Sequence, residues 1–234
     1  MLIALIIIVA LITLYVLSLR GRKGHPGLKA LQGWLYAHRG LHNEDRPENS
    51  MSAFRAALDG GYGVELDVHL LSDGNLAVMH DFSLKRTAGA DVLLEALTAE
   101  QLKDYHLGNT NETIPTFQEV LDLFDGQAPL IVELKCANGN YAQLCEAACN
   151  MLDSYNGVYC LESFDPRCIL WLKKNRPDLI RGQLSENYYH HPQLPVPWYL
   201  KFILTCQLEN FLLLPDFVAY HFDDRERLDN FIVR

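Results

Sequence analysis

Beyond residue 33, short apolar runs alternate with longer segments in which apolar side chains recur with helical spacing. The short runs predict strands, and some of them alternate strictly between apolar and polar positions. The longer segments predict helices, and repeated strand–helix units predict a parallel sheet with right-handed crossovers. The expected strands cover residues 34–37, 64–71, 76–80, 130–135, 158–163, 179–184 and 217–222.

The helix starts carry recognisable capping signals. Asn49 or Ser50 can cap a helix that Gly60-Gly61 closes. Thr98-x-x-Gln101 and Thr116-x-x-Glu119 both match the capping box, in which each partner satisfies a backbone N–H of the other. Further helices are expected at about 141–154 and, from Asp165-Pro166, to about residue 174.

Charged and histidine side chains gather at the carboxyl ends of the predicted strands. They are His38, Glu65, Asp67, His80, Glu133, Lys135 and Glu162. In an open doubly wound sheet such residues would spread along one edge, whereas in a closed barrel they meet on one face. Because many strands contribute, the sequence favours an α/β fold of the TIM (β/α)8 type.

The N-terminal segment differs from the rest of the chain. Residues 2–17 carry no charge, and Arg20, Arg22 and Lys23 follow at once. A cleaved signal peptide has its positive charge before the apolar run, so an uncleaved transmembrane helix is the favoured interpretation, ahead of a buried core helix. The expected organisation is an anchor at 1–19, a linker at 20–33 and a barrel at 34–234, and the positive-inside rule predicts a single-pass membrane protein with a cytoplasmic domain.

The charge of the remaining chain narrows the choice of partner. The formal net charge is −9, and acidic and basic residues are mixed along the sequence. Proteins that bind nucleic-acid backbones usually have a basic face, so a nucleic-acid partner is not expected.

Glu65 and Asp67 lie two positions apart on a predicted strand, so both side chains point to the same face. Neighbouring carboxylates repel one another unless a cation lies between them, and Mg2+ and Ca2+ prefer such oxygen ligands. Glu133 has the same setting on a later strand and is the candidate third ligand. The alternative is a ladder of salt bridges to Arg39 and Lys135.

His38 and His80 end two different strands. Histidine titrates near neutral pH, so this pair can act as base and acid, although either one alone would more often be structural. Arg39 and Lys135 supply fixed positive charge for a phosphate. The set points to metal-assisted cleavage of a phosphodiester.

With these residues in place, the chain resembles the glycerophosphodiester phosphodiesterase family. The matching motifs are Ala37-His38-Arg39-Gly40, Pro47-Glu48-Asn49-Ser50, Glu65-Leu66-Asp67-Val68, Asp73-Gly74, His80-Asp81, Glu133-Leu134-Lys135 and Glu162-Ser163-Phe164-Asp165. Each is weak alone, but together they keep the family's order and spacing from about residue 36 to 222.

The resemblance implies a TIM barrel that hydrolyses glycerophosphodiesters to glycerol phosphate and an alcohol, in lipid or phosphodiester metabolism. It implies His38 and His80 as the acid/base pair, and Glu65, Asp67 and Glu133 as ligands of a divalent metal. Arg39 and Lys135 would hold the phosphate. It also implies that the substrate's neighbouring hydroxyl can attack phosphorus, giving a cyclic phosphate that water then opens.

The chain departs from the family at its end. Family members close the barrel with an eighth strand carrying a Trp-Thr-x-Asn-like motif, whereas residues 231–234 here follow a helical pattern, so a barrel lacking the last strand is expected. Two alternative functions stay open. One is a lysophospholipase D acting on membrane lysolipids, and the other is a catalytically silent barrel that binds headgroups.

Four further features have weaker expectations. Residues 198–214 form a dense apolar segment that is either an extra core helix over the rim, or a lid or interfacial helix beside the bilayer at the catalytic face. His190-His191 favours a polar loop over a metal site. His69 is expected at the rim without a role, and Asn49 is expected to cap the first barrel helix and hold the loop after His38.

Overall fold

The computed structural model describes residues 1–192, 196–227 and 230. In these ranges seven strands form one sheet in the order β1-β2-β4-β5-β6-β7, with β3 paired to β2. The strands are β1 (Tyr36–His38), β2 (Gly63–Leu70), β3 (Leu76–Val78), β4 (Leu130–Leu134), β5 (Tyr159–Ser163), β6 (Arg181–Ser185) and β7 (Phe217–Tyr220).

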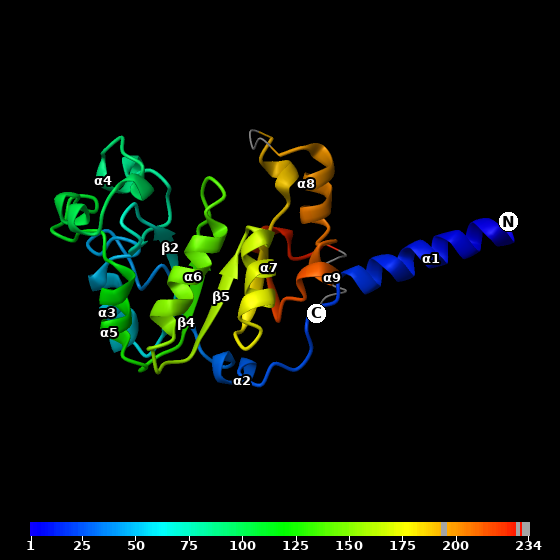
Figure 1. Cartoon of the computed structure of the whole chain (residues 1–234), viewed down its shortest axis with the longest axis horizontal. Coiled ribbons are helices and arrows are strands. Elements are labelled where there is room, and N and C mark those ends of the chain that lie inside the picture. Colours follow the sequence, from blue (N-terminus) through cyan, green and yellow to red (C-terminus); the bar gives the residue numbers. More distant parts are fainter. Residues whose placement is uncertain (193–195, 228–229, 231–234) are drawn as a thin grey trace.

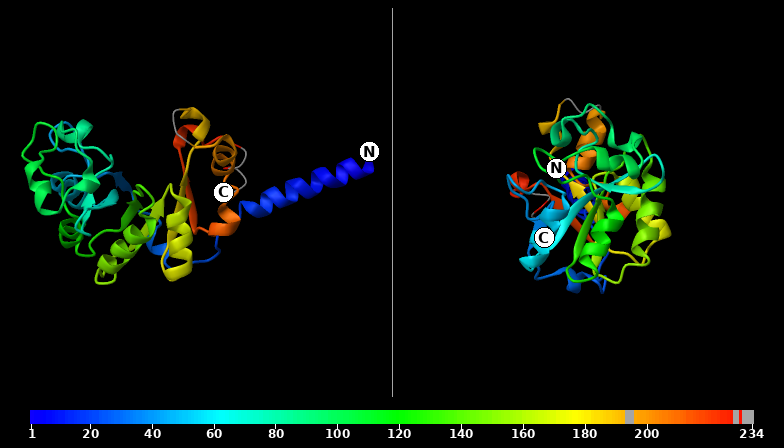
Figure 2. Two further views of the ribbon diagram at one scale, coloured as in Figure 1. Left: turned by 45° about the horizontal axis from the view of Figure 1, so that its top comes forward. Right: turned by 90° about the vertical axis from the view of Figure 1, so that its left-hand side faces the viewer.

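Helices connect the strands and cover one face of the curled sheet (Figures 1 and 2). The α-helices are α1 (Leu2–Ser18), α2 (Leu28–Leu31), α3 (Met51–Asp59), α4 (Lys85–Ala88), α5 (Phe117–Phe124), α6 (Tyr141–Leu152), α7 (Pro166–Asn175), α8 (Trp198–Thr205) and α9 (Asn210–Leu213). Short 3-10 turns are η1 (Leu94–Ala96), η2 (Glu100–Asp104), η3 (Tyr188–His190) and η4 (Phe222–Asp224).

The six strands of the main path pair in parallel, which confirms the predicted α/β class. In the described ranges β1 and β7 are the two ends of the strand order, so the sheet is a curled parallel half-barrel. Within the described residues, this agrees with a TIM-like fold without the last strand of a closed barrel. All carboxyl ends of these parallel strands lie at one end of the half-barrel, where TIM-type enzymes build their sites.

The core lies between the sheet and the helices. Val64, Leu66 and Val68 on β2 are fully buried there, as the alternation predicted, together with Phe54 of α3 and Phe117 of α5. Burying each such side chain contributes about 1.5–3 kcal/mol. Because the apolar side chains of β2 take the outer layer, Glu65 and Asp67 must point into the half-barrel.

The third predicted strand pairs differently from a barrel strand. β3 runs antiparallel to β2, with Val68 opposite Val78. The turn between them is tight, with Gly74 at φ 85° and a bond from Gly74 N–H to Leu71 O. A parallel crossover needs a dozen or more residues, so this connection can make only a hairpin. A second apolar cluster, which includes Met79, Leu84, Leu94 and Leu102, follows β3.

The capping predictions have mixed outcomes. Thr116 and Glu119 form the complete capping box at the start of α5, as predicted. Thr98 N–H donates to Gln101 Oε1 at 2.9 Å, but the segment forms the 3-10 turn η2 and not an α-helix. At α3 the cap is Ser50, whose hydroxyl accepts from Ala53 N–H, so the assignment of Asn49 as the cap is wrong.

The predicted membrane anchor is contradicted. The helix at this position, α1, has 17 residues, which at 1.5 Å per residue is about 26 Å, short of the roughly 30 Å of a bilayer core. Among the described residues, none of the helices combines the length and the apolar character needed to cross a membrane. The expected single-pass localisation with a cytoplasmic domain is therefore wrong, and the membrane as a partner through residues 1–19 is not supported.

Residues 20–33, the expected linker, contact the end of the half-barrel opposite to the site. Arg22 forms an ion pair with Asp216, and its N–H donates to Pro215 O at 2.8 Å. His25 Nε2 lies 2.8 Å from Asp178 O. These contacts hold the segment against the loops that precede β6 and β7.

Candidate active site

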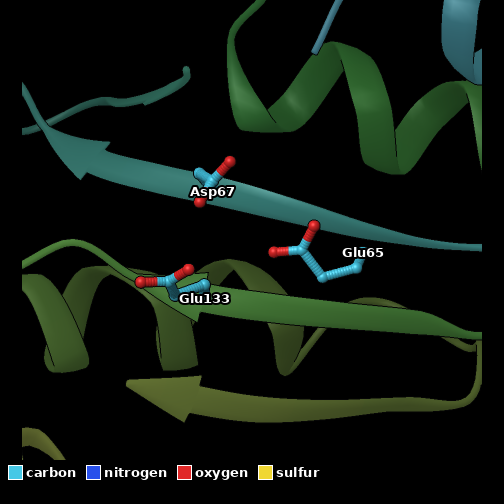
Figure 3. A group of neighbouring side chains, drawn as sticks. All are labelled: Glu65, Asp67 and Glu133. Carbon is cyan, nitrogen blue, oxygen red and sulfur yellow. The ribbon is translucent and has the colours of Figure 1, made fainter. Parts of the chain in front are cut away.

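The parallel register brings the predicted site residues to one end of the half-barrel. His38 on β1 is opposite Glu65 on β2, and Asp67 on β2 is opposite Glu133 on β4. Figure 3 shows the side chains of Glu65, Asp67 and Glu133 turned toward one another from these two strands. Alternation along β2 places Glu65 and Asp67 on the inner face, and the pairing of Asp67 with Glu133 between β2 and β4 places the third carboxylate there as well.

Glu65, Asp67 and Glu133 form an acidic triad. One carboxylate oxygen of each lies within 4.8 Å of the others, a separation that a single ion with oxygen ligands at about 2.0–2.6 Å can bridge. Burial, and then the neighbouring carboxylates, raise the pKa of Glu65 to about 9. Burial raises the pKa of Glu133 to about 7. Such crowding of negative charge is costly without a cation, so these residues fit a divalent metal.

Lys135 lies beside the triad. Its Nζ is 3.0 Å from Asp67 Oδ1 and 2.8 Å from Glu133 Oε1. Arg39 Nε lies 3.7 Å from Asp67 Oδ2. The salt bridges of the alternative ladder interpretation are therefore present. They leave Glu65 without a side-chain ion pair to a lysine or arginine among the described residues, and burial followed by the nearby carboxylates keeps the pKa of Glu65 raised.

Asp67 is the best-compensated member of the triad. Burial opposes its ionisation, but Lys135 and the side chain of Asn49 outweigh that effect and lower the pKa of Asp67. Asn49 Nδ2 donates to Asp67 Oδ2 at 2.8 Å. Asn49 N–H also donates to Arg39 O at 2.9 Å, which confirms that Asn49 holds the loop after His38.

The loop after β1 has an unusual backbone. Arg39 has φ 57° and Gly40 has φ 80°. A Cβ on Gly40 would lie 2.9 Å from the backbone of Ala53, so glycine is needed both for the conformation and for the close approach to α3. Arg39 N–H donates to Glu65 O at 2.9 Å. The loop thereby directs Arg39 toward Asp67.

His38 and His80 lie at the same end of the half-barrel. His38 Nε2 is 3.7 Å from Glu65 Oε2, and 69% of its side chain is exposed. His80 Nδ1 is 2.7 Å from Asp81 Oδ1. Burial and then Arg39 lower the pKa of His38, while burial and Lys135 lower the pKa of His80. These shifts favour the neutral imidazole, the state in which a histidine can accept a proton.

Two acidic neighbours of the site were not assigned a role from the sequence. Glu162 on β5 is opposite Glu133 and is buried, and burial followed by Glu133 raises its pKa to about 8. Its position at a strand end was the available signal. Glu48, from the Pro-Glu-Asn-Ser motif, binds Arg39 Nη1 at 3.0 Å.

The structure also places the other histidines singled out in the sequence. His69 is fully buried and not at the rim, with its ring packed edge-on against Phe82 and its Nε2 3.4 Å from His80 O. The His69 side chain lies on the inner face of β2, in line with Glu65 and Asp67. The segment after β3 covers this face, and Phe82 of that segment contacts the His69 ring. His190 and His191 take part in no group of three possible metal ligands within the described residues.

The segment at 198–214 lies partly at the catalytic end. Ser185, which ends β6, donates to Leu204 O at 2.8 Å, and Tyr188 N–H donates to Thr205 Oγ1 at 3.1 Å. These bonds fix α8 at the same end as the triad (Figure 1). Trp198 and Phe202 are exposed on it, so α8 is not an additional core helix.

A family comparison decides what kind of protein carries this site. The model of the glycerophosphoryl diester phosphodiesterase family matches residues 38–212. The chain belongs to this family. The sequence resemblance is thereby confirmed, and the match includes every predicted site residue from His38 to Lys135.

Two curated members of the family illustrate the likeness. A glycerophosphodiester phosphodiesterase of Caldanaerobacter subterraneus subsp. tengcongensis is 32% identical over 160 residues, which cover 64% of this chain and 65% of that protein. Human glycerophosphodiester phosphodiesterase 1 is 33% identical over 220 residues, which cover 78% of this chain and 65% of that protein. The chain therefore spans less than two thirds of the length of these relatives.

A solved structure supports the fold. The Oleispira antarctica phosphodiesterase, in complex with the product sn-glycerol-3-phosphate, superimposes with a TM-score of 0.65 at 21% identity. The match covers 82% of this chain and 85% of that one. The curled sheet seen here is thus an architecture shared with that enzyme.

Proposed function

We propose that the chain is a metal-dependent phosphodiesterase that hydrolyses glycerophosphodiesters to glycerol phosphate and an alcohol, in lipid or phosphodiester metabolism. The observation that carries the proposal is the convergence of Glu65, Asp67 and Glu133 within 4.8 Å. Membership of the family supports the substrate class. The product bound to the Oleispira relative supports glycerol phosphate as the product here.

In this proposal Glu65, Asp67 and Glu133 hold a Mg2+ or Ca2+ ion. When bound, the ion supplies positive charge to the phosphate oxygens. Lys135 and Arg39 stand on two sides of Asp67 and bind the same phosphate through their own charges. Their fixed positions, set by a buried strand and by the tight loop after β1, orient phosphorus relative to the histidines.

His38 and His80 carry the proton transfers. One imidazole takes the proton of the attacking oxygen, which belongs to water or to the substrate's neighbouring hydroxyl. The phosphorus–oxygen bond to the alcohol then breaks, and the other histidine, as imidazolium, protonates the leaving oxygen. If a cyclic phosphate forms first, water opens it in a second step with the two roles exchanged. Such proton transfers contribute about 10²- to 10⁴-fold each.

The test is an assay of the full chain with sn-glycero-3-phosphocholine after removal of metal with EDTA. We expect release of glycerol 3-phosphate when Mg2+ or Ca2+ is restored, none in EDTA, and loss of release in His80→Ala. Turnover that persists in EDTA would contradict the metal role. Absence of turnover with either metal, combined with saturable binding in calorimetry, would favour the alternative of a silent headgroup-binding barrel.

One observation favours a second candidate, a lysophospholipase D acting on lysolipids. Trp198 is 75% exposed and Phe202 48% exposed on α8, at the end of the half-barrel that holds the triad. Burial of apolar surface contributes about 25 cal/mol per Å2, so these side chains would favour a substrate with an acyl chain. The reaction at phosphorus is the same for both candidates.

Matched variants separate the two candidates. Trp198→Ser/Phe202→Ser removes apolar surface from α8, and Phe211→Ser/Leu212→Ser removes similarly exposed surface from α9. If lysolipids are substrates, the α8 variant alone should lose lysolipid turnover while keeping turnover of sn-glycero-3-phosphocholine. Equal effects of both variants on both substrates would contradict the second candidate.

A further inference from the structure

Arg86 of α4 joins two loops that follow different strands. Its Nε lies 2.6 Å from Asp81 Oδ2, and its Nη2 lies 3.0 Å from Asp81 Oδ1. On its other side, Nη1 lies 3.1 Å from Glu48 Oε2, and Nη2 lies 2.6 Å from Glu48 Oε1. All three guanidinium nitrogens are therefore engaged, and all four oxygens of two carboxylates are bound.

Both carboxylates also contact residues of the candidate active site. Asp81 Oδ1 lies 2.7 Å from His80 Nδ1. Glu48 Oε1 lies 3.0 Å from Arg39 Nη1, which belongs to the loop after β1. Arg86 thus lies between the histidine that follows β3 and the loop that carries Arg39.

We propose that Arg86 is a positioning residue for His80. Anchored on Glu48, it holds the Asp81 carboxylate in one place, and Asp81 in turn receives the Nδ1–H of His80. The imidazole then has one tautomer and one orientation, with Nε2 available for proton transfer. This inference rests on the proposed phosphodiesterase function for its kinetic consequence, but the effect on the tautomer does not depend on turnover.

The exposure of Arg86 separates this role from a structural one. Half of its side chain, 51%, is exposed, and exposed ion pairs contribute only about 0–1 kcal/mol to folding. The planar guanidinium fork of arginine binds a carboxylate through two N–H groups and so fixes its orientation, whereas the ammonium of lysine acts as a point charge. The Arg86 hydrogen bonds also hold the pKa of Asp81 down to about 2, so its carboxylate is ionised and able to accept from His80.

Arg176 provides a matched control. Its Nη2 also joins two carboxylates, at 2.8 Å to Asp153 and 3.1 Å to Asp178. It follows α7 near the amino end of β6, which is the opposite end of the half-barrel from His80. Loss of this arginine removes a similar bridge without touching the site.

The first experiment is steady-state kinetics of the full chain with Mg2+ or Ca2+ and sn-glycero-3-phosphocholine. We expect kcat of Arg86→Ala to fall about 10- to 100-fold, the usual cost of losing a group that orients a functional side chain. Arg176→Ala should stay within about twofold of the unmodified chain. Added guanidinium should restore part of the activity of Arg86→Ala and none of that of His80→Ala.

A double variant tests whether Arg86 acts through His80. If it does, Arg86→Ala should lower the residual activity of His80→Ala by less than about twofold, because groups that act as a unit are not additive. A reduction as large as that in the unmodified chain would overturn the inference, and so would an Arg86→Ala variant with unchanged kcat.

The second experiment reads the histidine directly. Nitrogen NMR of the His80 ring should show the Nδ1–H tautomer in the unmodified chain and a mixture in Arg86→Ala, with the Arg176→Ala spectrum unchanged. An unaltered His80 tautomer in Arg86→Ala would overturn the inference even if the chain proved inactive. Should Arg86→Ala not fold, Arg86→Lys keeps the charge without the fork and should show the same loss of a single tautomer.

Discussion

Asn49 Nδ2 donates a 2.8 Å hydrogen bond to Asp67 Oδ2. Asn49 makes this bond from a left-handed backbone at φ 54°, a conformation that asparagine adopts more readily than most residues. Ser50, the next residue, caps α3. Two adjacent side chains of the loop after β1 therefore have different roles. Asn49 supports the Asp67 carboxylate, and Ser50 starts α3.

We predict that Asn49→Ala weakens metal binding about 10- to 100-fold, because it removes the donor that orients the Asp67 carboxylate. Ser50→Ala should cost about 1 kcal/mol of stability through loss of the cap and leave metal affinity unchanged. Titration calorimetry with Ca2+ and thermal unfolding measure the two effects. Equal metal affinities of the two variants would show that Asn49 does not support Asp67.

The metal interpretation and the salt-bridge ladder differ in what Glu65 does. If the triad binds a metal, a divalent ion at 100 times its Kd should stabilise the unmodified chain by about 2.7 kcal/mol. Glu65→Gln should abolish that shift while leaving the metal-free protein as stable or more stable, because a buried carboxylate is removed. Thermal unfolding with and without metal decides the matter. A metal-independent loss of stability in Glu65→Gln would favour the ladder.

We predict that His38→Ala and His80→Ala each lower kcat by about 10²- to 10⁴-fold, as expected for proton-transfer groups. The pH–rate profile of the unmodified chain should be bell-shaped, because one histidine must be neutral and the other protonated. His25→Ala, at the opposite end of the half-barrel, is the control and should have normal kinetics. Near-normal activity of either site variant would rule out its assigned role.

Stability should depend on pH through Glu209. Its carboxylate oxygens have no partner outside their own residue among the described residues, and burial raises the pKa of Glu209 to about 7 from its ordinary 4.5. The folded chain therefore keeps this proton at pH values where the unfolded chain has lost it. The contribution of Glu209 to the free energy of unfolding should fall as pH rises from about 4.5 to about 7 and stay constant above that range.

Glu209→Gln removes the buried carboxylate and with it the loss of stability on ionisation. At pH 8 the variant should be more stable than the unmodified chain by up to about 3 kcal/mol, since one unit of pKa is worth about 1.4 kcal/mol. Urea unfolding at pH 5 and pH 8 measures the difference. Glu146→Gln, an exposed position on α6, should leave the pH dependence unaltered. The same slope in Glu209→Gln as in the unmodified chain would mean that another group is responsible.

The acidic triad could be predicted from local pattern. Alternation on a strand puts Glu65 and Asp67 on one face whatever surrounds them, and parallel strands bring their carboxyl ends together. That was sufficient to expect Glu133 nearby. The roles of the triad and of His38 and His80 stay predictions, because proximity alone does not show a bound metal or a proton transfer.

Other features depended on distances that no local pattern contains. The burial of His69 followed from the segment after β3, whose Phe82 packs edge-on against the His69 ring. For α1, apolar composition suggested a membrane helix, but the length of the helix contradicted it.

By itself, the sequence determined which residues share a strand face, because side chains alternate between the two faces with the period of the backbone. It also determined where the strands end and which family's motifs they carry, because both follow from the order of residues along the chain. Tertiary structure alone decided which side chains from separate loops meet. Arg86 is 38 residues from Glu48 in the chain, yet Arg86 Nη2 lies 2.6 Å from Glu48 Oε1. Contacts between loops depend on the packing of the elements beneath them, so the arginine between His80 and the loop after β1 became visible only in the folded chain.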